Sequence, residues 1–133
     1  MFIKPNMICH DLSRRICLCL TAIVFFAIAV RAILAPEKMA HGLGYVLSNQ
    51  NSYSEFYAIY FGVWIATGGL ALLAAIRVRQ VLLGDLVAMF VLAQPVGRGW
   101  ALLQYGPPEG TLLVLSMVEL IGGLILLLVR PSA

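Results

Sequence analysis

Four long apolar runs, separated by short polar connections, dominate the hydrophobic pattern of the chain. The runs cover residues 16–34, 55–76, 81–103 and 111–129. At ~1.5 Å of rise per residue, about 20 helical residues cross the ~30 Å hydrocarbon core of a bilayer. The pattern therefore predicts an all-α protein, an integral membrane four-helix bundle.

The run at residues 55–76 has two different faces when it is drawn as a regular α-helix. Its small residues lie on one face, at Ala58, Gly62, Ala66 and Gly69. Its aromatic residues lie on the opposite face, at Tyr57, Tyr60 and Trp64. Because small residues let membrane helices approach closely, we expect the first face to pack inside the bundle. The aromatic face is then left for lipid or for a partner protein.

Polar residues and prolines mark the ends of the runs. We expect residues 1–15 to form a cytoplasmic N-terminal lead and residues 131–133 a C-terminal tail, with a single transmembrane domain at residues 16–130. A basic start before an apolar run also resembles a secretory signal peptide, but we interpret the first run as a spanning helix. Pro36 ends this helix, because the residue before a proline disfavours helical geometry.

The connection at residues 35–54 is the longest of the polar ones. Its scattered apolar residues predict a short helix on the membrane surface. Ser52 and Glu55 have the spacing of a capping box, in which two side chains satisfy free backbone N–H groups at a helix start. Glu55 therefore has a structural interpretation beside any functional one.

The composition indicates that the bilayer is the solvent of this chain. Its 133 residues are 62% hydrophobic and 11% charged, with a mean hydropathy of +0.96. Soluble domains contain ~25% charged residues, and one small soluble core cannot bury so much apolar surface. The net charge of +3 does not indicate nucleic acid as a partner, because the basic residues flank apolar runs and form no single patch.

Basic residues are distributed unevenly between the two sides of the predicted bundle. Those in the N-terminal lead, the second connection and the C-terminus are Lys4, Arg14, Arg15, Arg77, Arg79 and Arg130. The first and third connections hold only Lys38. Lysine and arginine accumulate on the cytoplasmic side of membrane proteins. We therefore expect both termini in the cytoplasm.

Five polar side chains in or beside the runs form a candidate ligand-binding site: Arg31, Glu55, Gln94, Arg98 and Glu119. The predicted topology places all of them toward the side opposite the termini. A charge near the bilayer centre costs ~2.5–3.5 kcal/mol even on lenient scales, so opposite charges should pair. We expect Arg98 to pair with Glu119 first, and Arg31 with Glu55 second.

Asp85 stands apart from this candidate site, in the half of the bundle nearer the termini. The second connection lies at the same end and carries Arg77 and Arg79. We expect one of these two arginines to be the partner of Asp85.

The sequence shows no pattern typical of a metal or catalytic centre. Cys17 and Cys19 are two residues apart in a predicted helix and point in different directions, which suits neither a disulfide nor a metal pair. Nothing resembles a nucleophile with its base or a phosphate-binding loop. We therefore expect no metal site, no cofactor and no catalytic residue.

Short motifs in the apolar runs resemble a known family. They are Glu55-Phe-Tyr-Ala58-Ile-Tyr60-Phe-Gly62, Gly97-Arg98 and Glu119. They are similar to those of the bacterial four-helix membrane family catalogued as domain of unknown function 4345, over nearly the whole chain from the first helix onward. The resemblance implies the architecture and a location in a bacterial inner membrane, and it implies no activity. The small DoxX-like membrane proteins are a broader class with a similar pattern.

Three functions fit these observations. The first is a non-enzymatic accessory or assembling subunit, with a larger membrane protein or a second copy against the aromatic face. The second is a binder or transporter of a small amphipathic or lipid-like molecule at the charged cluster, since ionisable groups inside membranes mark pathways. The third is a membrane enzyme that uses Glu119 or Glu55 as a proton carrier. The alternative to all three is a structural role, in which the charges set the helix register.

Overall fold

The computed structural model describes residues 5–130, and the side chains of residues 11–130. Within these residues the fold is all-α, and four helical segments are long and apolar enough to cross a membrane. The fold is therefore that of a multi-pass membrane protein. Its elements are α1 (Pro5–Leu34), α2 (Pro36–Gly42), α3 (Gln50–Tyr57), the π-helix η1 (Ala58–Val63), α4 (Trp64–Ile76), α5 (Val81–Tyr105) and α6 (Gly110–Leu128).

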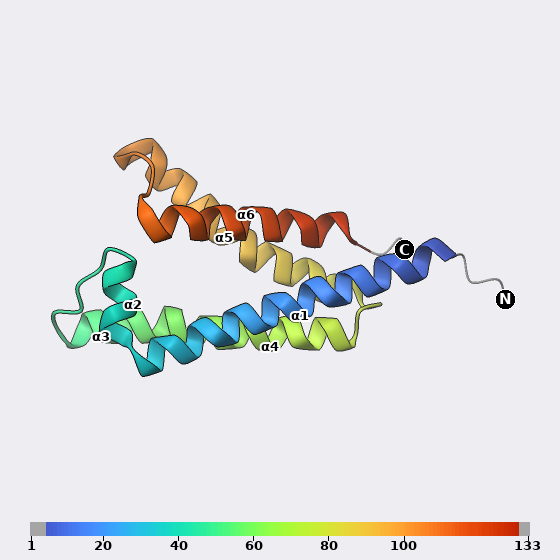
Figure 1. The fold of residues 1–133 in the computed structure, drawn as a ribbon, viewed down its shortest axis with the longest axis horizontal. Coiled ribbons are helices and arrows are strands. Elements are labelled where there is room, and N and C mark those ends of the chain that lie inside the picture. Colours follow the sequence, from blue (N-terminus) through green and yellow to red (C-terminus); the bar gives the residue numbers. More distant parts are fainter. Residues whose placement is uncertain (1–4, 131–133) are drawn as a thin grey trace.

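The spanning helices form two pairs. α1 lies along α4, and α5 crosses α6; the two pairs meet mainly through α4 and α5 (Figure 1). The start of α1, the end of α6 and the α4–α5 connection lie at one end of the bundle, here called the termini end. α2, α3 and the α5–α6 connection lie at the other, here called the α2 end. Four successive antiparallel spans thus bring the start of α1 and the end of α6 to the same end.

The helix boundaries differ from the predicted ones mainly at the N-terminal side. α1 begins at Pro5, well before the predicted start at residue 16. The hydrophobic run marks only the part suited to lipid, whereas the helix continues through polar residues that contact α5. Residues 1–4 and the expected tail at 131–133 lie outside the described residues. The other ends agree within about two residues, apart from the start of the second spanning segment.

The second spanning segment begins at Gln50, earlier than the predicted residue 55. Its capping box is formed by Asn49 and Ser52, not by Ser52 and Glu55. The Asn49 side chain accepts a hydrogen bond from the Ser52 backbone N–H at 2.9 Å, and the Ser52 hydroxyl accepts one from the Asn49 backbone N–H at 3.1 Å. Glu55 lies exposed one turn later and takes no part in the cap.

The two faces of this segment are the reverse of the predicted ones. All four small residues of the predicted packing face are exposed: Ala58, Gly62, Ala66 and Gly69. Among the aromatic residues, Tyr60 and Trp64 are buried at 8% and 2% exposure, and Tyr57 is half-buried. The predicted packing face is therefore wrong for the packing within one chain, and Tyr60 and Trp64 pack inside the chain.

The π-helix η1 explains part of this reversal. In an α-helix, residues four apart are rotated by about 40° from one another. A π-helix winds more widely, so Phe56, Tyr60 and Trp64 stay in line on the inner face. Their rings are 4.8 Å and 5.2 Å apart, and Phe25 of α1 meets Trp64 edge-on at 5.4 Å. These rings pack in tilted and edge-on contacts and fill the space between α1 and the second spanning segment.

Small residues do mediate the close approach of α1 and α4, but they are a different set. The buried ones are Ala22, Ala29 and Ala32 in α1, and Gly68, Ala71, Ala74 and Ala75 in α4. A Cβ atom at Gly68 would lie only 3.0 Å from the ring of Phe26. The packing rule for membrane helices is therefore obeyed, on the face opposite the predicted one.

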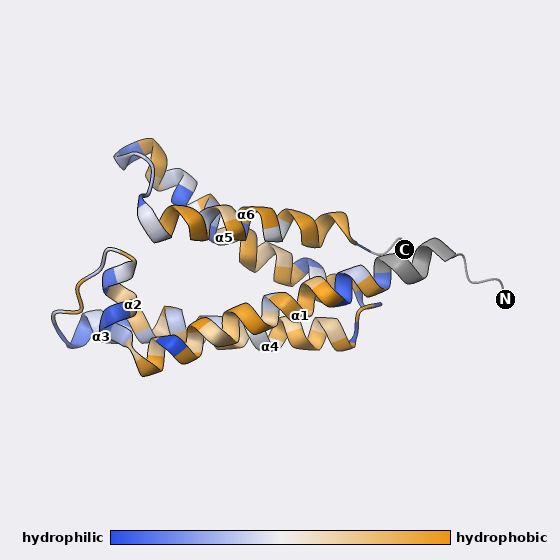
Figure 2. Cartoon of the chain, viewed as in Figure 1, coloured by the Kyte–Doolittle hydropathy of each residue, from blue (hydrophilic) through white to orange (hydrophobic). Residues whose placement is uncertain are grey.

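Large apolar side chains cover the outside of the bundle, for example Leu20, Ile23, Val114 and Ile121. Hydrophilic ribbon gathers toward the two ends, and the middle of the four spanning helices is mostly apolar (Figure 2). Such an exterior is favourable against hydrocarbon and unfavourable in water.

The connection between α1 and α3 folds back onto the α2 end. α2 buries Met39, and Leu43 is buried directly after it. The Tyr53 hydroxyl donates a hydrogen bond of 2.8 Å to Glu37 and so ties α3 to α2. The pKa of Glu37 is lowered from its ordinary value, first because its own backbone N–H donates to the carboxylate and then because of Tyr53.

Candidate functional site

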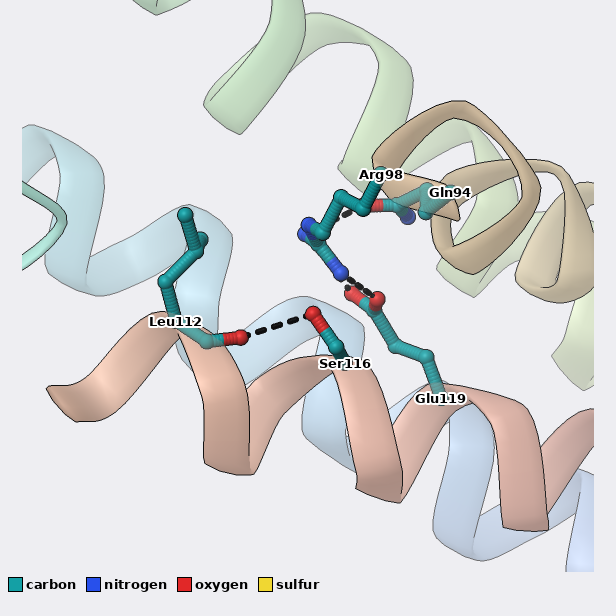
Figure 3. A network of polar contacts seen from close by, with 5 residues as sticks. All are labelled: Gln94, Arg98, Leu112, Ser116 and Glu119. Carbon is teal, nitrogen blue, oxygen red and sulfur yellow. Dashed lines mark hydrogen bonds and ion pairs between the residues drawn. The ribbon is translucent and has the colours of Figure 1, made fainter. Parts of the chain in front are cut away.

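An ion pair between α5 and α6 is the most buried polar feature among the predicted site residues. Arg98 reaches across from α5 and donates hydrogen bonds to both carboxylate oxygens of Glu119 (Figure 3). Gln94, one turn earlier on α5, accepts from Arg98 Nη2 at 3.5 Å. The side chains of Arg98 and Glu119 are 19% and 7% exposed. The predicted pair is therefore confirmed, with Gln94 beside it.

This ion pair lies deep in the spanning region. Glu119 is nine residues into α6, about 13 Å along its axis, and it occupies the middle of that helix. Arg98 lies seven residues before the end of α5, about 10 Å from the α2 end of that helix. Two charges at this depth are stable only because each neutralises the other.

The other predicted pair does not form. Among the described residues neither Arg31 nor Glu55 has an ion-pair partner. Arg31 lies exposed in the last turn of α1, and Glu55 lies exposed in α3. Each lines a different cavity. The predicted cluster is therefore wrong as a single site, because counting residues along helices gives depth but not the direction of a side chain.

A second buried ion pair lies at the termini end, where sequence reasoning placed no site. Arg14 of α1 is 1% exposed and donates to Asp85 Oδ1 at 2.9 Å and to the Val81 carbonyl at 3.1 Å. Arg130, which follows α6, reaches Asp85 Oδ2 at 3.0 Å. Asp85 of α5 thus joins α1 to the end of α6.

The expectation that Asp85 pairs with Arg77 or Arg79 is wrong. Asp85 is paired with Arg14 and Arg130, and Arg79 instead faces Asp11 at 3.6 Å. Arg77 and Arg79 are close to Asp85 along the chain, but the α4–α5 connection turns both side chains toward solvent.

Gly84 makes room for the Arg14 guanidinium against α5. A Cβ atom at this position would lie 2.3 Å from Arg14 Nη2. In the sequence, the glycine immediately before an aspartate inside a helix was the signal for this contact. The signal is weak, because glycines occur inside helices for many packing reasons that involve no charge.

An apolar cavity of about 230 Å³, here called the central cavity, lies between the two helix pairs. α1 lines one side with residues from Cys17 to Ile28, and α6 lines the other with residues from Leu115 to Ile125. Trp64 of α4 and Val91 of α5 close it. Among the described residues of this lining, Glu119 is the charged one, and Arg98 neutralises it.

A second cavity of about 260 Å³, here called the end cavity, lies toward the α2 end. It shares Ile28, Trp64 and Leu115 with the central cavity, so the two are neighbours along the same seam. Arg31 and Thr111 are its polar residues, and the region around α2 covers it with Met39 and Leu43. Together the two cavities form a seam that is apolar along the middle of the bundle and basic at its end.

The sequence matches the family model described as Domain of unknown function (DUF4345), over residues 13–130. The chain belongs to this family. No curated protein and no solved structure matches the chain. The family resemblance expected from the sequence is therefore confirmed, and the chemistry of this DUF4345 chain has to be argued from its own residues.

Three hydroxyl groups near the seam are held by their own helices. Thr21, Thr67 and Ser116 each donate a hydrogen bond of 2.8 Å to the backbone carbonyl four residues earlier. Figure 3 shows that of Ser116, which points to Leu112 and not to Glu119. Within the described residues, no group of three or more His, Cys, Asp or Glu side chains could hold a metal ion.

Proposed function

We propose that this protein binds a single-chain amphipathic, lipid-like molecule in the seam between its two helix pairs. The observation that carries the proposal is the central cavity, whose lining is almost entirely apolar and continues past Trp64 into the end cavity. Apolar cavities stay dry and accept apolar guests. Within a bilayer, the available guests are acyl chains.

The size of the seam supports this occupant. The two cavities together fall in the range of small-molecule sites, ~300–1,000 Å³. Along α1 the lining extends from Cys17 to Arg31, which is about 21 Å at ~1.5 Å per residue. This length exceeds half of the ~30 Å hydrocarbon core, so an acyl chain fits lengthwise.

Tryptophan fluorescence tests the proposal directly, because the chain holds two tryptophans in contrasting places. Trp64 is 2% exposed and lines both cavities, whereas Trp100 is 69% exposed. In a Trp100→Phe background, dibrominated stearate in phosphatidylcholine nanodiscs should quench Trp64 saturably. A Trp64→Phe variant reports, through Trp100, how much of the probe has simply entered the bilayer.

A cavity-filling variant with a matched control decides whether the seam is the site. A Cβ atom at Gly122, in the central cavity, meets nothing within 4 Å, and neither does one at the exposed Gly97. Gly122→Phe should therefore abolish saturable quenching of Trp64, and Gly97→Leu should leave it unchanged. Quenching of Trp64 that merely follows the quenching of Trp100, or that survives Gly122→Phe, would refute the proposal.

The exposed small-residue face of the second spanning segment favours a second candidate function, an assembling subunit. Ala58, Gly62, Ala66 and Gly69 lie together on the outside of the chain, where they offer close approach to a helix of a second copy or of a larger membrane protein. Gly62→Leu should then abolish a complex that is isolated in mild detergent and detected by cross-linking. A complex that survives Gly62→Leu would exclude this face as the interface.

We further propose that the termini end faces the cytoplasm of a bacterium and that the protein resides in the inner membrane. The support is the accumulation of basic residues at that end, from Arg14 and Arg15 to Arg77, Arg79 and Arg130. Reporters fused at His41 and Pro108 should be accessible from outside the cell. A reporter at Gln80 that is labelled from outside in intact cells would contradict this orientation.

A further inference from the structure

The end cavity holds a cation that no described protein group neutralises. Arg31 is the charged residue in its lining, and among the described residues it has no ion-pair partner. Two carboxylates in α2 and α6 are engaged elsewhere. Glu37 accepts the hydrogen bond of Tyr53, and Glu119 is paired with Arg98. Arg31 therefore gives the lining of the end cavity a positive charge.

The start of α6 adds to this positive field. Thr111, the second residue of α6, lines the end cavity. Backbone N–H groups in the first turn of a helix have no partner within the helix, and its N-terminus carries a partial positive charge. Glu109 occupies the cap position but its side chain makes no capping hydrogen bond. An oxyanion between Arg31 and Thr111 would meet donors on both sides.

We propose that the occupant of the seam is an anionic single-chain amphipath, whose carboxylate or phosphate head binds Arg31 while its tail fills the central cavity. This inference rests on the proposed function and adds the charge of the ligand. Arg31 repels a cationic head, and a neutral head leaves its guanidinium without a counter-charge. At the far end of the seam the charge of Glu119 is already balanced, so only the tail is accommodated there.

The test compares probes that share one acyl chain and differ in their head group. It uses the Trp100→Phe background and phosphatidylcholine nanodiscs. Dibrominated stearate and dibrominated stearyl alcohol differ only in the head, and a monoacyl phosphatidate with the same dibrominated chain separates phosphate from carboxylate. Trp64 should be half-quenched by an anionic probe at a concentration roughly tenfold lower than by the alcohol, as expected for a single charge-assisted hydrogen bond. The anion that half-quenches Trp64 at the lower concentration identifies the preferred head group.

Variants of Arg31 locate this preference. Arg31 is exposed, so Arg31→Gln should fold and should lose the preference for the anion, and Arg31→Lys should retain part of it. Arg77→Gln removes an exposed cation at the termini end and should leave the preference unchanged. Equal quenching by anion and alcohol with Arg31 in place, or a preference that persists in Arg31→Gln, would overturn the inference while leaving lipid binding intact. Absence of saturable quenching by every probe would overturn lipid binding and the inference together.

Discussion

Asp85 should be the most sensitive charged position at the termini end, and the structure sets the expected order of effects. Asp85→Asn leaves the Arg14 guanidinium, 1% exposed, without its carboxylate. Arg14 Nη1 already lacks a hydrogen-bond partner among the described residues, so the remaining protein cannot compensate. Breaking a buried ion pair on one side costs ~3–5 kcal/mol, a large share of the ~5–15 kcal/mol that stabilises a typical protein.

The partners of Asp85 should be less sensitive, in proportion to their burial. Arg130 is 57% exposed and returns to solvent when released, so Arg130→Gln should cost ~0–1 kcal/mol. Arg14→Leu leaves Asp85, which is 25% exposed, still paired with Arg130, so its cost should lie between the other two. Arg79→Gln, at an 86% exposed side chain, is the control and should change stability by less than about 0.5 kcal/mol.

The assay is unfolding of the purified protein by increasing sodium dodecyl sulfate in dodecylmaltoside micelles, followed by tryptophan fluorescence. The double variant Arg14→Leu with Asp85→Leu removes both buried charges and should recover part of the loss caused by Asp85→Asn. Equal losses for Arg130→Gln and Asp85→Asn would refute the reasoning, because burial would then not determine the cost of losing a partner.

The spanning region and the α2 end can be tested in three further ways. Arg98→Leu and Glu119→Leu should each cost ~3–5 kcal/mol in the same assay, and the double variant should recover much of this loss; additive losses would mean that the pair is not coupled. Trp64→Leu should cost ~2 kcal/mol or more because it removes two ring contacts and leaves a cavity. Gly62→Leu should be nearly neutral in the isolated chain. The opposite order of the two costs would restore the faces expected from the sequence. An NMR titration should give Glu37 a pKa below the ordinary glutamate value. Its hydrogen bonds then stabilise the α2 end at any pH above the ordinary glutamate pKa, and this stabilisation is lost as the pH falls through the lowered pKa. A titration midpoint at or above the ordinary glutamate pKa would contradict this.

The four spanning segments and the pairing of Arg98 with Glu119 could be derived from the sequence. Hydropathy and length determine which segments enter a bilayer, because unsatisfied polar backbone cannot remain in hydrocarbon. Once the topology is known, the rise per residue places Arg98 and Glu119 at similar depths, and the cost of an isolated charge makes them seek each other. These inferences depend only on properties that are local to one helix.

The inward face of each helix was decided only by the tertiary structure. Lipid and protein interior are about equally apolar, so the pattern that reveals the core of a soluble protein is absent in a membrane helix. The direction of Trp64 also depends on the π-helix η1, which no sequence pattern predicts and which changes the angular spacing of the residues around it.

The buried contact of Arg14 and the seam between the helix pairs were likewise decided by packing. Arg14 lies in a stretch whose sequence is typical of a polar lead, and only the approach of α5 at Gly84 buries it against Asp85. The two cavities exist because the helix pairs meet mainly through α4 and α5 and leave space between α1 and α6. Volume left between helices is a property of their relative placement, and the sequence determines it only through all the side-chain contacts together.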